Sequence, residues 1–157
     1  MSESAPALYP LGPALDFMQR IWQLNHAIER LSLTMERRLG VTAQQRLVVR
    51  ALGKFPGITA GHLARVLHLD PGTVSAALNR LDEKGLVDRR RNPRDRRRSS
   101  LALTSKGRAL DLPATGTVEA AVERLLAGAS RADLLVAEAL LARLVALLEE
   151  GTRETRD

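Results

Sequence analysis

Apolar residues recur at steps of three and four along most of this chain, which is the spacing of a helix that buries one face. The first such stretch runs from Ala14 to about Arg38 and ends at Gly40. A second runs from Thr42 to Lys54, a short third follows Thr59, and a fourth begins at Pro71 and stops at Gly85. The pattern therefore predicts a long helix followed by three shorter ones.

The starts of these helices carry recognisable capping residues. Thr42 and Gln45 form a capping box, and Asp70 followed by Pro71 is a strong helix-start signal. The residues expected to face inward are Leu47, Val48, Ala51 and Leu52 in the second helix, and Val74, Ala77, Leu78 and Leu81 in the fourth.

A β-hairpin is predicted directly after the fourth helix. Its strands are residues 86–91 and 99–103, and Asn92-Pro93 supplies the turn signal between them. Residues 89–98 read RRRNPRDRRR, so seven of the ten residues around the tip are arginine. The order of short helix, tight turn, second helix and basic hairpin is that of a winged helix-turn-helix, in a fold that is mainly α with a small β-hairpin.

The last third of the chain is again helical. Thr104 caps a helix that Pro113 interrupts, helix resumes near Thr117, and a final helix follows Ser130 to about Glu150. Because the apolar residues of this final helix cover more than one face, it needs a second partner surface, which favours a dimer.

Composition and charge narrow the function. A length of 157 residues suits one domain, or one domain with a dimerising extension. The net charge of +6 points to a polyanionic partner, with nucleic acid ahead of an anionic membrane. The sequence has no Cys, which excludes disulfides, thiolate catalysis and cysteine redox sensing. The first residues do not resemble a signal peptide and no stretch is long and apolar enough to span a bilayer, so we expect a cytoplasmic protein.

The fourth helix presents the candidate DNA-reading face. Its outward residues are small or polar, and no acidic residue is expected on that face before Glu83. They are Gly72, Thr73, Ser75, Ala76, Asn79 and Arg80. Small residues permit close approach to a major groove, and the polar ones supply donors and acceptors for base edges and phosphates. The alternative is a solvated face in a domain that binds protein.

Three motifs carry a resemblance to a known family. Residues 81–87 end the fourth helix in a Leu-x-x-x-Gly-Leu-Val step, Asp95-Arg96-Arg97 lies in the hairpin, and Leu103-Thr104-Ser105-Lys106-Gly107 enters the next helix. With these motifs, residues 15–150 resemble the MarR family of bacterial transcriptional regulators. The resemblance implies a homodimer that binds a near-palindromic double-stranded DNA operator, with N- and C-terminal dimerisation helices. The expected organisation is an irregular arm (1–13), a dimerisation helix (14–40), a winged helix-turn-helix lobe (41–104), C-terminal dimerisation helices (105–150) and a polar tail (151–157).

The resemblance also assigns roles within the hairpin. It implies that Arg97 enters the minor groove, whose negative potential attracts arginine, and that Asp95 orients its guanidinium. The alternative for Asp95 is simple charge relief within the arginine run. The remaining arginines, among them Arg89, Arg91 and Arg94, are expected to contact phosphates or to be solvated, which predicts a steep salt dependence of binding.

One position departs from the family pattern. Many relatives have an acidic residue at the place of His62, where it would complete a capping box with Thr59. Two interpretations stay open for His62, namely donation to a DNA phosphate and simple exposure.

A ligand site is the least defined prediction. The resemblance implies release from DNA by a small aromatic or phenolic ligand, so the expected function is a ligand-responsive homodimeric repressor. Trp22, His26 and Arg30 lie four residues apart on one helix face and could hold an aromatic carboxylate. Alternatively, they pack at a dimer interface or lie on the surface.

Other functions fit the sequence less well. The three histidines show no pair at metal-ligand spacing, so no metal or cofactor is expected. No catalytic grouping is visible, which argues against an enzyme. An architectural or constitutive DNA-binding protein without an effector is the main alternative, and RNA binding by the arginine run is a further one.

Overall fold

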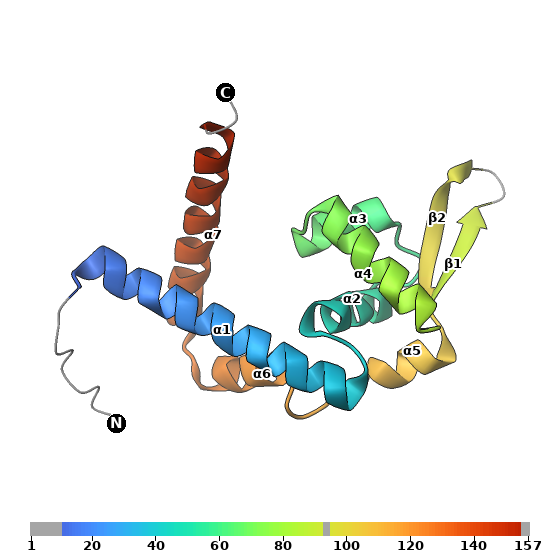
Figure 1. The fold of residues 1–157 in the computed structure, drawn as a ribbon, viewed down its shortest axis with the longest axis horizontal. Helices are drawn as coiled ribbons and strands as arrows, with labels where there is room; N and C mark the ends of the chain where they lie inside the picture. Colours follow the sequence, from blue (N-terminus) through green and yellow to red (C-terminus); the bar gives the residue numbers. More distant parts are fainter. Residues whose placement is uncertain (1–10, 93–94, 155–157) are drawn as a thin grey trace. The chain divides into compact units, whose positions relative to one another are not determined.

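The computed structural model describes residues 11–92 and 95–154. In these ranges the chain forms helices α1 to α7 and strands β1 and β2 (Figure 1). The chain divides into two compact units, residues 1–118 and 119–157. The first holds α1 to α5 and the hairpin, and the second holds almost all of α6 and the whole of α7.

Helix α1 spans Pro13–Leu39 and ends where predicted, at a left-handed Gly40 with φ 74°. Met35 is its only buried residue, so α1 is anchored to the first unit near its C-terminal end. The predicted irregular arm covers residues 1–13. Residues 1–10 lie outside the described part of the chain, whereas Pro13 already begins the helix.

Helix α2 (Ala43–Lys54) begins with the predicted capping box. The Thr42 hydroxyl accepts from the Gln45 backbone N–H, and the Gln45 side chain accepts from the Thr42 N–H. The prediction that Leu47 faces inward is wrong, because this side chain is 47% exposed. The buried stripe runs instead through Gln45, Val48, Val49 and Leu52, at the i, i+3, i+4 and i+7 positions of one helix face.

Helices α3 (Ala60–Leu67) and α4 (Pro71–Glu83) form the helix-turn-helix. His68 bridges them in a left-handed conformation with φ 50°, and the Leu69 N–H donates to the Ala64 carbonyl at 3.0 Å. The inward residues predicted for α4 are confirmed: Val74, Ala77, Leu78 and Leu81 are all buried.

The hairpin consists of β1 (Val87–Asn92) and β2 (Asp95–Leu103), which pair antiparallel. Its strands reach farther toward the tip than predicted, since β2 already begins at Asp95, and the register shifts between Arg91 and Asn92. The base of the hairpin belongs to the core, because Leu86, Val87, Leu101 and Leu103 are buried among residues of α2, α3 and α4. The helical core therefore holds the hairpin beside α4 (Figure 1).

Beyond the hairpin, Thr104 caps α5 (Ser105–Leu110), which ends before Pro113 as predicted. In the second unit, α6 spans Val118–Gly128 and α7 spans Arg131–Glu154. Helix α7 continues beyond the expected end at Glu150. The Thr152 hydroxyl donates to the Leu148 carbonyl at 2.9 Å, and Arg153 lies 4.0 Å from Glu149, one turn away. These contacts help to extend the helix into the polar residues that follow Glu150.

Candidate nucleic-acid interface

Helix α4 is held in place by its cap and by its buried face. The Asp70 carboxylate accepts from the backbone N–H groups of Gly72 at 2.8 Å and Thr73 at 3.2 Å, as an N-cap does. Pro71 occupies the first turn, where its missing N–H costs nothing. The cap, Pro71 and the packing of the apolar side in the core fix the orientation of α4. The opposite side of the helix therefore faces outward.

The outward side consists of the residues predicted for it. Gly72, Ser75, Ala76, Asn79 and Arg80 are exposed, and Thr73 is half-buried. The side chains are short except for Arg80, so a partner can approach the helix backbone closely. Donors and acceptors are available at Ser75, Asn79 and Arg80 for hydrogen bonds to such a partner.

The expectation of no acidic residue before Glu83 needs a correction. Asp82 is half-exposed and lies three residues after Asn79, so the two are neighbours on the helix surface. Its carboxylate is 3.8 Å from Nε of Arg89, which partly offsets its charge.

The hairpin contributes two arginines whose contacts are defined. Arg89 donates from Nη2 to Oδ1 of Asn79 at 2.5 Å, which joins β1 to α4. Arg90, the next residue along β1, donates from Nε to Oδ2 of Asp88 at 3.1 Å. Successive side chains of a strand point to opposite faces, and only the Arg89 side chain contacts α4 by a described bond.

The predicted tip residues are described only in part. Arg91, Asp95 and Arg97 lie on β1 and β2 by their backbone, and Arg94 lies outside the described residues. The side-chain roles given to these four residues stay predictions. His62 is exposed on α3, and its backbone N–H donates to the Thr59 hydroxyl at 3.3 Å.

Two lysines that the sequence did not single out fix the C-terminal end of this surface. Lys84 follows α4 directly and donates from Nζ to the carbonyl oxygen of Gly40 at 2.7 Å and to Oε1 of Gln45 at 3.0 Å. Lys106 in turn donates to the Lys84 carbonyl at 2.9 Å. The C-terminal end of α4 is thereby tied to the α1–α2 corner and to α5.

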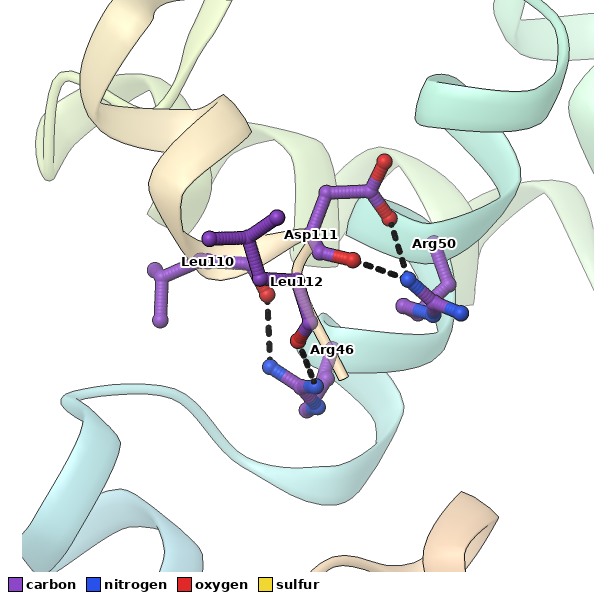
Figure 2. Close-up of polar contacts among 5 residues, drawn as sticks. All are labelled: Arg46, Arg50, Leu110, Asp111 and Leu112. Atoms are coloured by element: carbon purple, nitrogen blue, oxygen red, sulfur yellow. Dashed lines mark hydrogen bonds and ion pairs between the residues drawn. The ribbon is translucent and has the colours of Figure 1, made fainter. Parts of the chain in front are cut away.

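A pair of arginines on α2 holds the segment that follows α5 (Figure 2). Arg46 is buried and donates to the carbonyl oxygens of Leu110 at 2.6 Å and Leu112 at 2.9 Å. Arg50 donates to the carbonyl oxygen of Asp111 and, at 3.0 Å, to its carboxylate Oδ1. Arg46 and Arg50 together form a clamp on residues 110–112. In the sequence, only the four-residue spacing of the two arginines pointed to this clamp.

The candidate ligand residues Trp22, His26 and Arg30 are all exposed on α1, and Trp22 is 64% exposed. Two hollows described in the first unit have other linings. One, of about 420 Å³, lies beside α4 and is lined by Glu36, Gln44, Thr73, Arg80 and their neighbours. The other, of about 480 Å³, lies between α2 and α3 and is lined by Leu47, Phe55, Val66 and adjoining residues.

Within residues 11–92 and 95–154, no helix has the length and apolarity that crossing a bilayer requires. The same residues bring no three metal-ligating side chains together.

Comparison with known proteins relates this arrangement to a known family. The family model described as "MarR family" matches residues 39–98, which run from the end of α1 through most of the hairpin. The HTH-type transcriptional repressor Rv2887 of Mycobacterium tuberculosis is 34% identical over 89 residues, which make up 57% of this chain and 64% of that relative.

Solved structures are similar to this protein over a larger part of the chain than the family model covers. A mutant MarR from E. coli complexed with operator DNA is 27% identical, with a TM-score of 0.64, over 83% of this chain and 94% of that one. The PcaV transcriptional regulator from Streptomyces coelicolor, in complex with its natural ligand, is 25% identical, with a TM-score of 0.66, over 93% and 98% of the two chains. The family model over residues 39–98, the curated relative and the solved structures lead to the same comparison, and this chain resembles the MarR family in sequence and fold.

Proposed function

We propose that this protein is a sequence-specific DNA-binding transcriptional regulator that acts as a homodimeric repressor. The observation that carries the proposal is the exposed face of α4, small and polar from Gly72 to Arg80, lying beside a basic hairpin. A helix with this surface is suited to the major groove of duplex DNA. The repressor named among its relatives and the MarR structure with operator DNA support this proposal.

The proposed DNA contacts of α4 and of the hairpin differ in kind. Thr73, Ser75, Ala76, Asn79 and Arg80 face base edges and nearby phosphates from α4. In the hairpin, Arg97 enters the minor groove with Asp95 as its orienting carboxylate, and the surrounding arginines neutralise phosphates. Such neutralisation releases counterions, so affinity falls steeply as the salt concentration rises.

Dimerisation is supported by apolar surface on two helices, each considered by itself. On α7, side chains that are more than half exposed include Leu135, Val136, Leu140, Leu141, Val145, Leu147 and Leu148. On α1, Leu24 and Leu33 are likewise more than half exposed. Large apolar surfaces that remain exposed on soluble proteins mark interaction sites, so both helices suit an interface with a second copy. Two copies with twofold symmetry require a near-palindromic operator.

The repressor is further proposed to respond to a small aromatic or phenolic ligand, with Trp22, His26 and Arg30 as its contacts. These three residues offer an aromatic surface and positive charge on one side of α1, and the PcaV structure with its natural ligand supports a ligand-binding role. The alternative is a constitutive or architectural DNA-binding protein with no effector.

Selection from a pool of randomised duplexes tests the DNA-binding part. The expected product is an inverted repeat whose half-sites are centred about one helical turn apart. A pool that stays unenriched would contradict sequence-specific binding, and an enriched site without symmetry would contradict the dimer.

A thermal-shift screen of aromatic acids tests the ligand part. A ligand that stabilises the protein saturably and also weakens its binding to the selected duplex supports an effector. No stabilisation across such acids, with DNA binding intact, favours the constitutive alternative.

A further inference from the structure

We propose that Arg89 decides which base helix α4 selects, by fixing the orientation of the Asn79 amide. Arg89 is then a positioning residue, and not merely one of several phosphate contacts. The inference rests on the proposed function, because it requires that α4 reads the edges of bases in duplex DNA.

The geometry joins Arg89 to two residues of one helix face. Its Nη2 donates to Oδ1 of Asn79 at 2.5 Å, and its Nε lies 3.8 Å from Oδ2 of Asp82. Asn79 and Asp82 are three residues apart on α4 and therefore neighbours on its surface. The guanidinium thus lies along the C-terminal half of the face that carries the candidate base contacts.

The chemistry of the two groups leaves one orientation for the amide. A guanidinium offers donors only, whereas an asparagine side chain has an accepting oxygen on one side and a donating NH₂ group on the other. The oxygen of Asn79 must therefore face Arg89, since the flipped amide would set donor against donor. The NH₂ group is left on the side of the amide that points away from the hairpin.

This orientation has a consequence for base recognition. An asparagine that reads adenine uses both of its groups, since its oxygen accepts from N6 while its nitrogen donates to N7. With its oxygen held by Arg89, Asn79 approaches a base as a donor. Guanine presents two acceptors in the major groove, O6 and N7, whereas the amino group of adenine opposes an approaching donor. The arrangement therefore favours guanine over adenine at the position that Asn79 contacts.

Arg90 provides a matched control for Arg89. It is the adjacent residue on β1, carries the same charge and is bonded to Asp88 within the strand. Loss of either arginine removes one positive charge near the DNA, so the sequence-independent part of binding falls by a similar amount. Only the loss of Arg89 frees the Asn79 amide.

The test is selection from randomised duplexes by the wild type, Asn79→Ala, Arg89→Ala and Arg90→Ala, followed by titration of the enriched sites at one salt concentration. Asn79→Ala identifies the base position that Asn79 reads, as the position where the preference disappears. We expect the wild type to prefer guanine there, Arg89→Ala to reduce the guanine-to-adenine preference about fivefold or more, and Arg90→Ala to keep it. The Asn79→Ala, Arg89→Ala double variant should lose no more of this preference than Asn79→Ala alone.

The outcomes separate this inference from the proposed function. If the wild type enriches a site and Arg89→Ala keeps the full preference at the Asn79 position, the positioning role is wrong while the DNA-binding function stands. A wild-type preference for adenine at that position, or no position that depends on Asn79, would also overturn it. If the wild type enriches no site, the proposed function itself fails. Thermal unfolding of both arginine variants checks that each retains its fold.

Discussion

Arg46 donates from Nη2 to the carbonyl oxygen of Leu112 at 2.9 Å, across 66 residues of sequence. The same guanidinium donates to Leu110, while Arg50 holds Asp111 between them, so one face of α2 binds three consecutive carbonyl groups (Figure 2). A carbonyl at the end of a short helix has no intrahelical donor, and these arginines supply one. The clamp fixes the path of the chain as it leaves the winged helix-turn-helix.

Replacement of Arg46 by Met is expected to destabilise the protein by about 2–4 kcal/mol, because the carbonyl groups of Leu110 and Leu112 lose charge-assisted hydrogen bonds from a buried guanidinium. The measurement is the free energy of unfolding from urea titration. Arg20→Met is the control, since Arg20 is exposed on α1 and bonded only to nearby Gln23 among its described contacts. That variant should change stability by less than about 0.5 kcal/mol. Equal effects of the two substitutions would show that the clamp contributes nothing.

Gly107 is expected to tolerate no side chain. It is buried in α5, and a Cβ placed on it would lie 2.0 Å from the carbonyl oxygen of Leu86, which already accepts from the Thr104 N–H. Because the obstacle is backbone, Gly107→Ala should cost about 2 kcal/mol or more.

Gly61 is the matched helical glycine, exposed on α3 with nothing within 4 Å of an added Cβ. Gly61→Ala should stabilise by about 0.5–1 kcal/mol through helix propensity alone. Melting temperatures of the two variants should therefore move in opposite directions, and a shared direction would refute this explanation of Gly107.

Loss of the Asp70 cap is expected to loosen the start of α4. Asp70→Ala removes the acceptor for the Gly72 and Thr73 N–H groups and should cost about 1 kcal/mol, whereas Asp70→Asn should cost much less. Hydrogen exchange at the first turn of α4 should accelerate in Asp70→Ala. Unchanged exchange there would mean that Pro71 and the packing of α4 suffice without the cap.

Two arginines of the hairpin are expected to behave differently in DNA titrations. Arg97→Ala should weaken binding to the selected duplex by about 1–3 kcal/mol, as loss of a groove contact does. Arg91→Ala should lower affinity for selected and random duplexes alike, and reduce the slope of log affinity against log salt by about one unit. A loss confined to the selected duplex in Arg91→Ala would contradict its role as a phosphate contact.

Much of the fold could be predicted because its signals are local. The caps at Thr42, Asp70 and Thr104 lie within three residues of the groups they bind, and the inward face of α4 follows helical periodicity. Leu47 was wrongly predicted to face inward because α2 has apolar residues on two neighbouring faces. Helical periodicity alone does not say which of these faces packs against the core.

The side-chain network could not be predicted for the opposite reason. Lys84 finds its partner carbonyl 44 residues away at Gly40, and Arg46 binds groups that carry no side-chain signal at all. The contact between Asn79 and Arg89 depends on how the hairpin packs against α4, so the sequence predicted two separate DNA contacts where the structure joins them.

The most direct test of the central claim compares two duplexes in one fluorescence titration at fixed salt. One duplex is the selected inverted repeat and the other is a scrambled sequence of the same composition. The wild type should bind the repeat at least about a thousandfold more tightly. A Ser75→Ala, Asn79→Ala variant should lose most of that preference while keeping its affinity for the scrambled duplex. Equal affinity of the wild type for both duplexes would contradict sequence-specific recognition by α4.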